Sequence, residues 1–373
     1  MRILQLGKFY PPHRGGIETH LEALSRGLAK SATVEVIVAH DGRRGVVENF
    51  DGVRVQRLAT ICAPASTPIC PGMVGAIRHT PADLIHLHLP NPYAALALLL
   101  SGHPAPLVIS WHSDVVRQQR MARLVAPIAR AIVQRSAALV ASSPNYLEGS
   151  PTLSQNRART HVIPYGIEPG EFHPRDPARV AQIRARYGPR IVLGVGRLVY
   201  YKGFEHLIRA MARVAGHLLI VGEGPRHLQL ERAARVAGVG ARVSFLGDLS
   251  RDELIATYHA ADVFVLPAVA RSEAFGIVQL EAMACGRPVV NTRVASGVPF
   301  VSIDSETGIT VEPGAPEALS AALNLLLDDP ELRARYGAAG AQRVRDHFDL
   351  ATMLDRTLAL YRQILGAPRP AGQ

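Results

Sequence analysis

The sequence predicts an α/β protein built from two doubly wound domains. Short apolar runs alternate with helical segments along almost the whole chain, which is typical of parallel sheets with crossover helices. The alternation is interrupted once, by a segment rich in Pro and Gly around residues 161–170. A chain of 373 residues can bury two cores of ordinary size. We therefore expect a first domain over residues 1–164 and a second over residues 165–347.

Apolar runs in the first domain predict six strands, at residues 3–6, 34–39, 53–58, 84–88, 107–111 and 138–142. The first strand is followed by a loop that ends in Gly15-Gly16 and by a helix over residues 17–29. Paired glycines before a helix let the backbone approach a ligand closely. A plain flexible turn explains the same residues.

Histidines stand at the ends of two of these strands. His86 and His88 share one face of a strand end, but the sequence shows no third ligand nearby, so we do not expect a metal. His112 follows the strand at residues 107–111, at the edge where open α/β sheets bind ligands. His112 is either a functional residue or a hydrogen-bonded structural histidine.

Residues 115–136 form a basic helical pattern, with Arg117, Arg120 and Arg123 at intervals of three residues. Pro127 is expected to kink or split this helix. The arginines are either a solvated helix face or a basic face that lies on an anionic membrane surface.

In the second domain we expect strands at residues 191–195, 218–221, 243–246, 263–266 and 289–291. Arg197 and Lys202 lie between the first of these strands and a helix over residues 204–214. Arginine offers a planar fork to phosphate oxygens and lysine a mobile point charge. Lys202 is one of only three lysines in the chain, which favours a specific role over an ordinary surface position.

Residues 271–286 carry two glutamates, Glu273 and Glu281, with seven residues between them. Glu273 is expected in a loop and Glu281 in a helix that begins near Gly276, so the two carboxylates belong to different sub-sites of a long ligand. The junction between this loop and the helix comprises Ala274, Phe275, Gly276 and Ile277. Its backbone N–H groups, at the first helical turn, are free donors that favour a phosphate. An ordinary strand-loop-helix with solvated glutamates is the alternative.

Composition narrows the class of protein. Residues 1–165 carry 17 Lys and Arg against 9 Asp and Glu, so the first half holds most of the net charge of +10. No nucleic-acid-binding motif accompanies this charge, which favours an anionic membrane surface or an anionic substrate. The three cysteines, at positions 62, 70 and 285, do not predict disulfides or zinc. With no signal peptide, we expect the protein in the cytoplasm, either free or peripheral on the inner face of the plasma membrane.

These segments together resemble the retaining glycosyltransferases of family 4, which have the GT-B fold. The resemblance rests on Gly15-Gly16, Trp111-His112, Pro164-Tyr-Gly166, the run from Gly196 to Gly203, Val221-Gly-Glu-Gly224, and Glu273 with Glu281. It covers residues 1 to about 365. The runs that begin at His112 and at Asn291 are similar to bacterial mannosyl- and rhamnosyltransferases of surface-polysaccharide assembly.

The resemblance implies two Rossmann-like domains that face a central cleft, with a C-terminal helix over residues 348–366 that packs back on the first domain. It implies that Glu281 binds the ribose, that Arg197 and Lys202 bind the diphosphate, and that Glu273 with the amides of Phe275 and Gly276 holds the transferred sugar. It further implies that His112 reaches a sugar hydroxyl and that Gly16 approaches the phosphate or the sugar.

The expected reaction moves a hexose from a nucleotide-sugar, GDP-mannose in our prediction, to a lipid-linked or saccharide acceptor. Fixed cations would stabilise the leaving diphosphate, and the absence of an Asp-x-Asp pair fits transfer without a metal or other cofactor. Three alternatives remain on the same fold: a phosphorylase-like enzyme with pyridoxal phosphate on Lys202, a nucleotide-sugar epimerase, and a non-catalytic nucleotide-sugar-binding protein.

Overall fold

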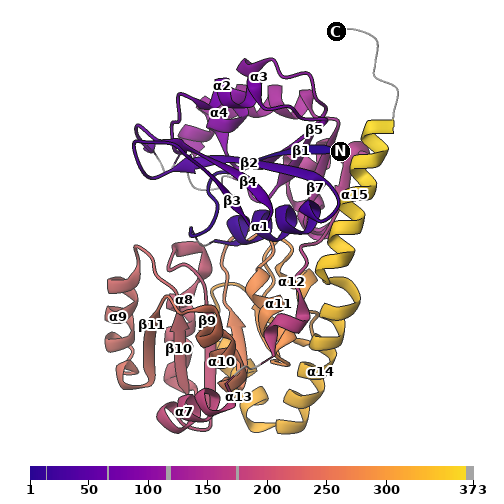
Figure 1. The fold of residues 1–373 in the computed structure, drawn as a ribbon. Coiled ribbons are helices and arrows are strands. Elements are labelled where there is room, and N and C mark those ends of the chain that lie inside the picture. Colours follow the sequence, from indigo (N-terminus) through magenta and orange to yellow (C-terminus); the bar gives the residue numbers. More distant parts are fainter. Residues whose placement is uncertain (14, 65–66, 115–118, 174–175, 367–373) are drawn as a thin grey trace. The chain divides into compact units, whose positions relative to one another are not determined.

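A computed structural model of the chain divides into two compact units (Figure 1). It describes residues 1–13, 15–64, 67–114, 119–173 and 176–366, and for residues 119–124 the backbone alone. The first unit comprises residues 1–166 and 350–373, and the second comprises residues 167–349. The boundaries that we expected from the sequence lie within three residues of these.

The first unit is built around an eight-stranded sheet with the order β3-β4-β2-β1-β5-β6-β7-β8. Its pairings are parallel except for that of β3 with β4. The strands are β1 (Arg2–Leu6), β2 (Thr33–His40), β3 (Val46–Phe50), β4 (Val53–Ala59), β5 (Leu84–Leu89), β6 (Leu107–Trp111), β7 (Ala138–Ala141) and β8 (Thr160–Val162). All six residues of β5 are buried, as expected for a central strand covered on both faces.

The helices of the first unit are α1 (Gly16–Ala29), α2 (Met73–His79), α3 (Pro92–Ser101), α4 (Gln119–Arg135), α5 (Pro144–Gly149), α6 (Pro151–Gln155) and α15 (Leu350–Gly366). The last of these lies against α1, where a Cβ on Gly27 would come within 2.3 Å of Leu354 (Figure 1). The apolar stripe of α15 buries Met353, Leu360 and Tyr361 in the core of this unit. The chain therefore returns to its first unit after completing the second.

The second unit contains a six-stranded, fully parallel sheet with the order β11-β10-β9-β12-β13-β14. The strands are β9 (Ile191–Val195), β10 (His217–Val221), β11 (Val243–Gly247), β12 (Val263–Leu266), β13 (Val289–Thr292) and β14 (Gly308–Val311). The helices are α7 (Pro177–Tyr187), α8 (Phe204–Ala210), α9 (His227–Val236), α10 (Arg251–Ala260), α11 (Ile277–Ala284), α12 (Val298–Val301), α13 (Pro316–Asp328) and α14 (Pro330–His347).

Local sequence explains where the helices around the second sheet begin. Ser250 and Glu253 form a reciprocal capping box at the start of α10, which satisfies two backbone donors of its first turn. Gly276 caps α11 with a left-handed backbone, φ +78°. A Cβ there would lie 2.5 Å from a methyl group of Leu266, so this N-cap position requires glycine.

The sequence prediction of the elements was incomplete at the sheet edges. It missed β3, β8 and β14. It also expected Pro127 to kink or split the basic helix; α4 is not split, because it runs from Gln119 to Arg135 with Pro127 inside it. Arg117 lies outside the described residues, and Arg120 and Arg123 belong to the part of α4 that is described by its backbone alone.

Candidate functional site

The predicted cations of the second unit lie at the carboxyl end of its sheet, in the loop between β9 and α8. The ammonium of Lys202 lies 2.7 Å from a carboxylate oxygen of Glu273, and both residues are 8% exposed. Glu273 comes from the loop that follows β12, the strand beside β9. The structure therefore brings together two residues that the sequence assigned to separate ligand groups, and joins them as a buried ion pair.

Two glycines make room for this ion pair. Gly196 has φ +143°, and a Cβ on it would lie 3.0 Å from the Lys202 side chain, which lies over it. Gly203 has φ +70°, and a Cβ there would lie 1.9 Å from the carbonyl oxygen of Pro267. The N–H of Val269 also donates to the carbonyl of Tyr201 at 2.9 Å. The two loops that carry Lys202 and Glu273 are thus packed backbone to backbone.

Arg197 precedes Lys202 in the same loop and is exposed. Its guanidinium makes no hydrogen bond or ion pair within the described part of the chain. An unpaired, planar cation beside a buried lysine is suited to binding an anionic group such as a phosphate.

The loop before α11 rests on buried amides. Gln279 is fully buried and donates from Nε2 to the carbonyls of Phe275 and Val298, at 3.1 and 3.3 Å. Asn291 in turn donates to Oε1 of Gln279 at 2.9 Å. The N–H of Gly297 closes the loop from the other side, with a 2.7 Å bond to the carbonyl of Ala274. These contacts hold the backbone from Ala274 to Ile277 at the start of α11, where the first turn presents its N–H groups.

Glu281 lies within α11 itself and is half-buried. The hydroxyl of Tyr258 donates to its carboxylate at 2.7 Å. Burial raises the pKa of Glu281, whereas the Tyr258 hydrogen bond and the charge of Arg251 act in the opposite direction. Tyr258 was not identified from the sequence. The sequence around Glu281 could not indicate this partner, because Tyr258 comes from a different helix, α10.

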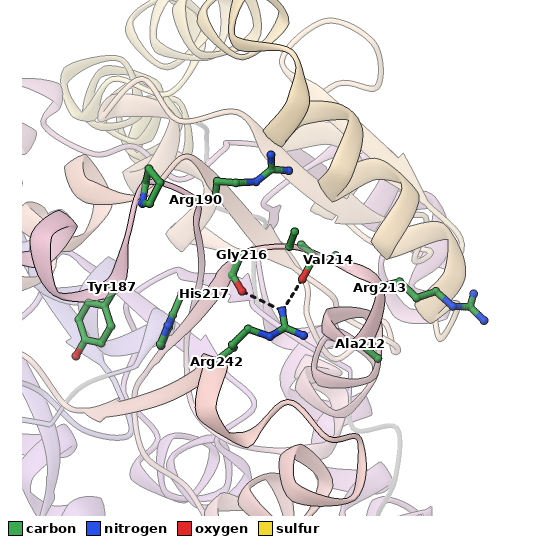
Figure 2. Close-up of a pocket in the computed structure, with 10 residues that line it drawn as sticks. Tyr187, Arg190, Ala212, Arg213, Val214, Gly216, His217 and Arg242 are labelled. Carbon is green, nitrogen blue, oxygen red and sulfur yellow. Dashed lines mark hydrogen bonds between the residues drawn. The ribbon is translucent and has the colours of Figure 1, made fainter.

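A hollow of about 700 Å³ lies elsewhere in the second unit (Figure 2). It is lined by Tyr187, Pro189, Arg190, Ala212, Arg213, Val214, Ala215, Gly216, His217 and Arg242. Because these residues surround the amino ends of β9, β10 and β11, the hollow lies at the edge of the sheet opposite Lys202 and Glu273. Its arginines already have partners: Arg242 donates to the carbonyls of Val214 and Gly216, and Arg190 pairs with Asp328. The hollow is not the candidate site.

In the first unit, Gly15 and Gly16 stand at the start of α1, and both are exposed. Gly15 is extended, with φ 175°, and its carbonyl accepts from Thr19 at 2.9 Å. A Cβ on Gly15 would meet only the flexible end of Glu18. The backbone at Gly15 therefore imposes no strict need for glycine in this structure.

His112 directly follows β6 and is 3% exposed. Its Nε2 lies 2.8 Å from Nδ1 of His88, and its Nδ1 is hydrogen bonded to the hydroxyl of Tyr165. Burial, together with the neighbouring His20 and His86, places the pKa of His112 well below its usual value. His112 is thus a neutral imidazole with both ring nitrogens engaged by the first unit itself.

The histidine cluster includes a residue that the sequence did not reveal. The ring centroid of His20 of α1 lies 5.3 Å from that of His112. One ring nitrogen of each of His20, His88 and His112 lies within 4.8 Å of the other two, close enough for the three to hold a metal ion. The expectation that His88 has no third histidine nearby is therefore wrong. In the structure, however, His88 and His112 are hydrogen bonded to each other, so a metal at these nitrogens would have to break that bond. A histidine on the buried face of a predicted helix was the available signal.

Comparison with known proteins assigns both units. Residues 15–166 match the glycosyl transferase 4-like domain, and residues 177–343 match the glycosyl transferases group 1. The chain is 32% identical to O-antigen chain mannosyltransferase C of Escherichia coli, over 98% of this chain and 99% of that protein. It is also 32% identical to D-rhamnosyltransferase WbpZ of Pseudomonas aeruginosa, over 93% of this chain and 92% of that protein.

A third relative is the GDP-mannose-dependent alpha-(1-6)-phosphatidylinositol monomannoside mannosyltransferase of Mycolicibacterium smegmatis, 32% identical over 92% of this chain and 94% of that protein. Solved structures share the fold. Sucrose-phosphate synthase of Thermosynechococcus elongatus superposes with a TM-score of 0.82, 24% identity, and coverage of 98% of this chain and 100% of that one. Anabaena HepE, in complex with UDP and glucose, superposes with a TM-score of 0.80 and 21% identity, over 97% of this chain and 100% of that one.

Among the described residues, no helix is both long and apolar enough to span a bilayer.

Two parallel-sheet units, each matched by a glycosyltransferase domain, together with full-length relatives that transfer hexoses, lead to one conclusion. The chain belongs to the family 4 glycosyltransferases of the GT-B fold and is a hexosyltransferase.

Proposed function

We propose that this glycosyltransferase moves mannose from GDP-mannose to a lipid-linked or saccharide acceptor, with retention of configuration and without a metal. The observation that carries the proposal is the cluster of Arg197, Lys202 and Glu273 at the carboxyl end of the second sheet. It combines an exposed cation, a buried cation and a carboxylate within two adjoining loops.

The chemistry explains why such a cluster is useful. Cleavage of the bond between sugar and phosphate builds negative charge on the leaving diphosphate, and preformed cations stabilise that charge without reorganisation. The guanidinium of Arg197 has no partner among the described residues, whereas Lys202 is ion-paired with Glu273. A bound diphosphate would compete for Lys202, and Glu273 would then accept hydrogen bonds from hydroxyls of the sugar. Glu281, held by Tyr258, would accept from the ribose.

Retention and metal independence rest on the same residues. In a double displacement, a carboxylate must attack the anomeric carbon. Glu273 is held against Lys202, and we assign it to the sugar hydroxyls, which favours attack on the same face with the leaving phosphate taking the acceptor's proton. The sequence also contains no Asp-x-Asp pair of the kind that holds a metal on a diphosphate. Pyridoxal phosphate on Lys202 would require that residue to give up its ion pair with Glu273.

The donor is inferred from the relatives. Two of the three that are 32% identical are named mannosyltransferases, and one of these is named as GDP-mannose-dependent. HepE, in contrast, was solved with UDP and glucose, but it is similar to this chain in fold alone. GDP-mannose is accordingly the first donor to test.

A thermal-shift screen tests the donor directly. Purified protein is heated with GDP-mannose, GDP, UDP-glucose, ADP-glucose and a dTDP-sugar at equal concentration. A ligand present at about 100 times its Kd stabilises the folded state by about 2.7 kcal/mol, which raises the melting temperature by a few degrees. We expect the largest shift with GDP-mannose. A larger shift with a UDP- or ADP-sugar would overturn the donor assignment.

The site is tested by Glu273→Gln and Lys202→Ala. Each should lower mannose transfer by at least about 100-fold, because each removes stabilisation of the transition state. Arg190→Ala is a matched control, since Arg190 is an ion-paired cation at the opposite edge of the same sheet. Its turnover should equal that of the wild type. Full activity in Lys202→Ala, with the fold intact, would refute the site.

A further inference from the structure

Seven buried side chains of the first unit, His112 among them, are joined one to the next by six hydrogen bonds. In order, the partners are Tyr165 with His112, His112 with His88, His88 with Gln5, Gln5 with Tyr361, Tyr361 with His86, and His86 with Ser110. The contact between the rings of His112 and His88 is 2.8 Å, as is that between His88 Nε2 and Oε1 of Gln5. Burial lowers the pKa of all three histidines, so each ring carries a single N–H.

Gln5 gives this chain a direction. Its Oε1 faces His88, and its Nε2 faces the hydroxyl of Tyr361. An amide oxygen can only accept, so Nε2 of His88 must carry the proton and Nδ1 of His88 must be the acceptor. The ring nitrogen that contacts this acceptor is Nε2 of His112, which must therefore be the donor. The remaining nitrogen, Nδ1 of His112, is left as an acceptor for the Tyr165 hydroxyl.

The other half of the chain agrees with this direction. Tyr361 accepts from the Gln5 amide, so its own O–H is available for Nδ1 of His86. His86 then donates from Nε2 to Oγ of Ser110 at 2.8 Å. All six bonds from Tyr165 to Ser110 can thus run in one direction, and rotating the Gln5 amide by half a turn would reverse them. A buried network whose bonds agree in direction favours one arrangement of its side chains.

We propose that Gln5 and His88 are positioning residues for His112, which they hold as the Nε2–H tautomer with Nδ1 as the acceptor. The consequence for the reaction rests on the proposed function, in which His112 bonds a hydroxyl of the transferred sugar. A hydroxyl that replaces Tyr165 at Nδ1 has to donate its own proton. His112 therefore recognises a hydroxyl donor at that position and gives nothing to an oxygen that can only accept.

The tautomer can be measured without any assay of activity. Protein labelled with ¹⁵N-histidine is studied by two-bond ¹H–¹⁵N correlation, in which the two neutral tautomers give different patterns, and His112 is assigned by the signals lost in His112→Gln. We expect the wild type to show His112 with a protonated Nε2 and a bare Nδ1. The opposite tautomer in the wild type would overturn the proposal.

Paired variants separate positioning from simple packing. His88→Asn keeps an acceptor oxygen where Nδ1 of His88 stood, and His88→Leu removes it. Likewise, Gln5→Glu keeps the acceptor for His88, and Gln5→Leu removes it. We expect His112 to keep its tautomer in His88→Asn and Gln5→Glu, and to become a mixture in His88→Leu and Gln5→Leu. A wild-type tautomer in both leucine variants would show that the chain does not hold it.

Kinetics then connect the tautomer to transfer. In His88→Leu, kcat should fall about 10- to 100-fold with little change in the donor KM, the usual cost of losing a group that orients a functional residue. His88→Asn should recover most of the loss. If the tautomer responds as expected but no nucleotide-sugar is turned over by the wild type, the proposed function fails and the tautomer assignment stands. Equal kcat in the wild type and His88→Leu overturns the positioning role.

Zinc provides the last control, because His20 contributes a third nearby imidazole, whose Nδ1 has no partner among the described residues. Spectra of the wild type are recorded after chelation and again with added Zn²⁺. We expect the resonances of His88 and His112 to be the same in both. A zinc-dependent loss of the His112 N–H signal would make the cluster a metal centre and overturn the proposal.

Discussion

The Lys202 ammonium and the Glu273 carboxylate face each other at 2.7 Å, and each side chain is only 10% exposed. They come from two loops that are joined by the bond between Val269 and Tyr201. In this state the site supplies its own counterion. A diphosphate that binds Lys202 has to replace that carboxylate, so the energetics of the pair bear on both stability and donor binding.

A double-mutant cycle on this pair should show strong coupling. Lys202→Met or Glu273→Leu alone leaves one buried charge without its partner, which costs about 3 kcal/mol of unfolding free energy. The double variant should be more stable than either single variant, because no unpaired charge remains. Urea unfolding measures all four proteins. Additive single effects would show that the two residues do not interact in solution.

Gly203 and Gly238 form a matched pair of glycines, since both have φ +70°. An alanine at Gly238 has nothing within 4 Å and should cost only the backbone strain, about 1 kcal/mol. In Gly203→Ala the new methyl group meets the Pro267 carbonyl oxygen, so the loss should be several times larger. Thermal unfolding of the two variants compares these costs directly. Equal losses would mean that the loop after β9 adapts without strain.

Tyr258→Phe tests the support of Glu281. The variant removes the 2.7 Å hydrogen bond to the carboxylate but keeps the ring. We expect the donor Kd to rise about tenfold, since a hydrogen bond to a charged group contributes about 1.5 kcal/mol, with kcat nearly unchanged. Calorimetric titration with GDP and with GDP-mannose measures the change. Tyr187→Phe, in the hollow at the opposite edge of the sheet, is the control and should bind as the wild type does.

The buried histidines should make the protein sensitive to acid. Burial lowers the pKa of His20 and His86 to about 3, against about 6.5 in the unfolded chain. Below pH 6.5 the unfolded state therefore binds protons at these histidines that the folded state does not bind. Stability is complete above pH 6.5 and falls by about 1.4 kcal/mol per pH unit for each such residue, down to about pH 3. Unfolding free energies at pH 7 and 5 measure the slope, which His20→Leu should reduce by one residue's share.

Membrane association is tested at the basic helix predicted from the sequence. Changing Arg117, Arg120 and Arg123 together to Glu should weaken binding to anionic vesicles by about 1 kcal/mol for each lost cation. Sedimentation with vesicles of acidic lipid, at low and moderate salt, measures the partition. Neutral vesicles are the control. Unchanged binding to acidic vesicles would show that the three arginines form an ordinary solvated helix face.

The sequence was most informative where the signal is local. Runs of apolar residues identified the central strands, and the expected change from loop to helix near Gly276 placed Glu273 in a loop and Glu281 in a helix, as found. Edge strands were missed because they are short and partly exposed: Val46 and Val47 of β3 are 42% and 58% exposed, so no apolar run marks them.

The contacts within the site could not be predicted in the same way. The ion pair of Lys202 with Glu273 depends on β9 and β12 being neighbours in the sheet, although β10 and β11 come between them in the chain. The hydrogen-bond partners of His112 come from strand β5 and from the segment that follows β8, and the β5 partner, His88, is itself bonded to Gln5 of β1. Such relationships exist only once the order of the strands is known.

The return of α15 to the first unit has a topological consequence. The second unit is an insertion whose two ends meet, since the N–H of Ile167 donates to the carbonyl of Phe348 at 2.9 Å and Ile167 bridges to Asp349. Residues 167–349 therefore form a closed module with its own core and its own parallel sheet. The second unit could be excised at this junction and studied as an autonomous domain, with a short linker in its place to close the first unit.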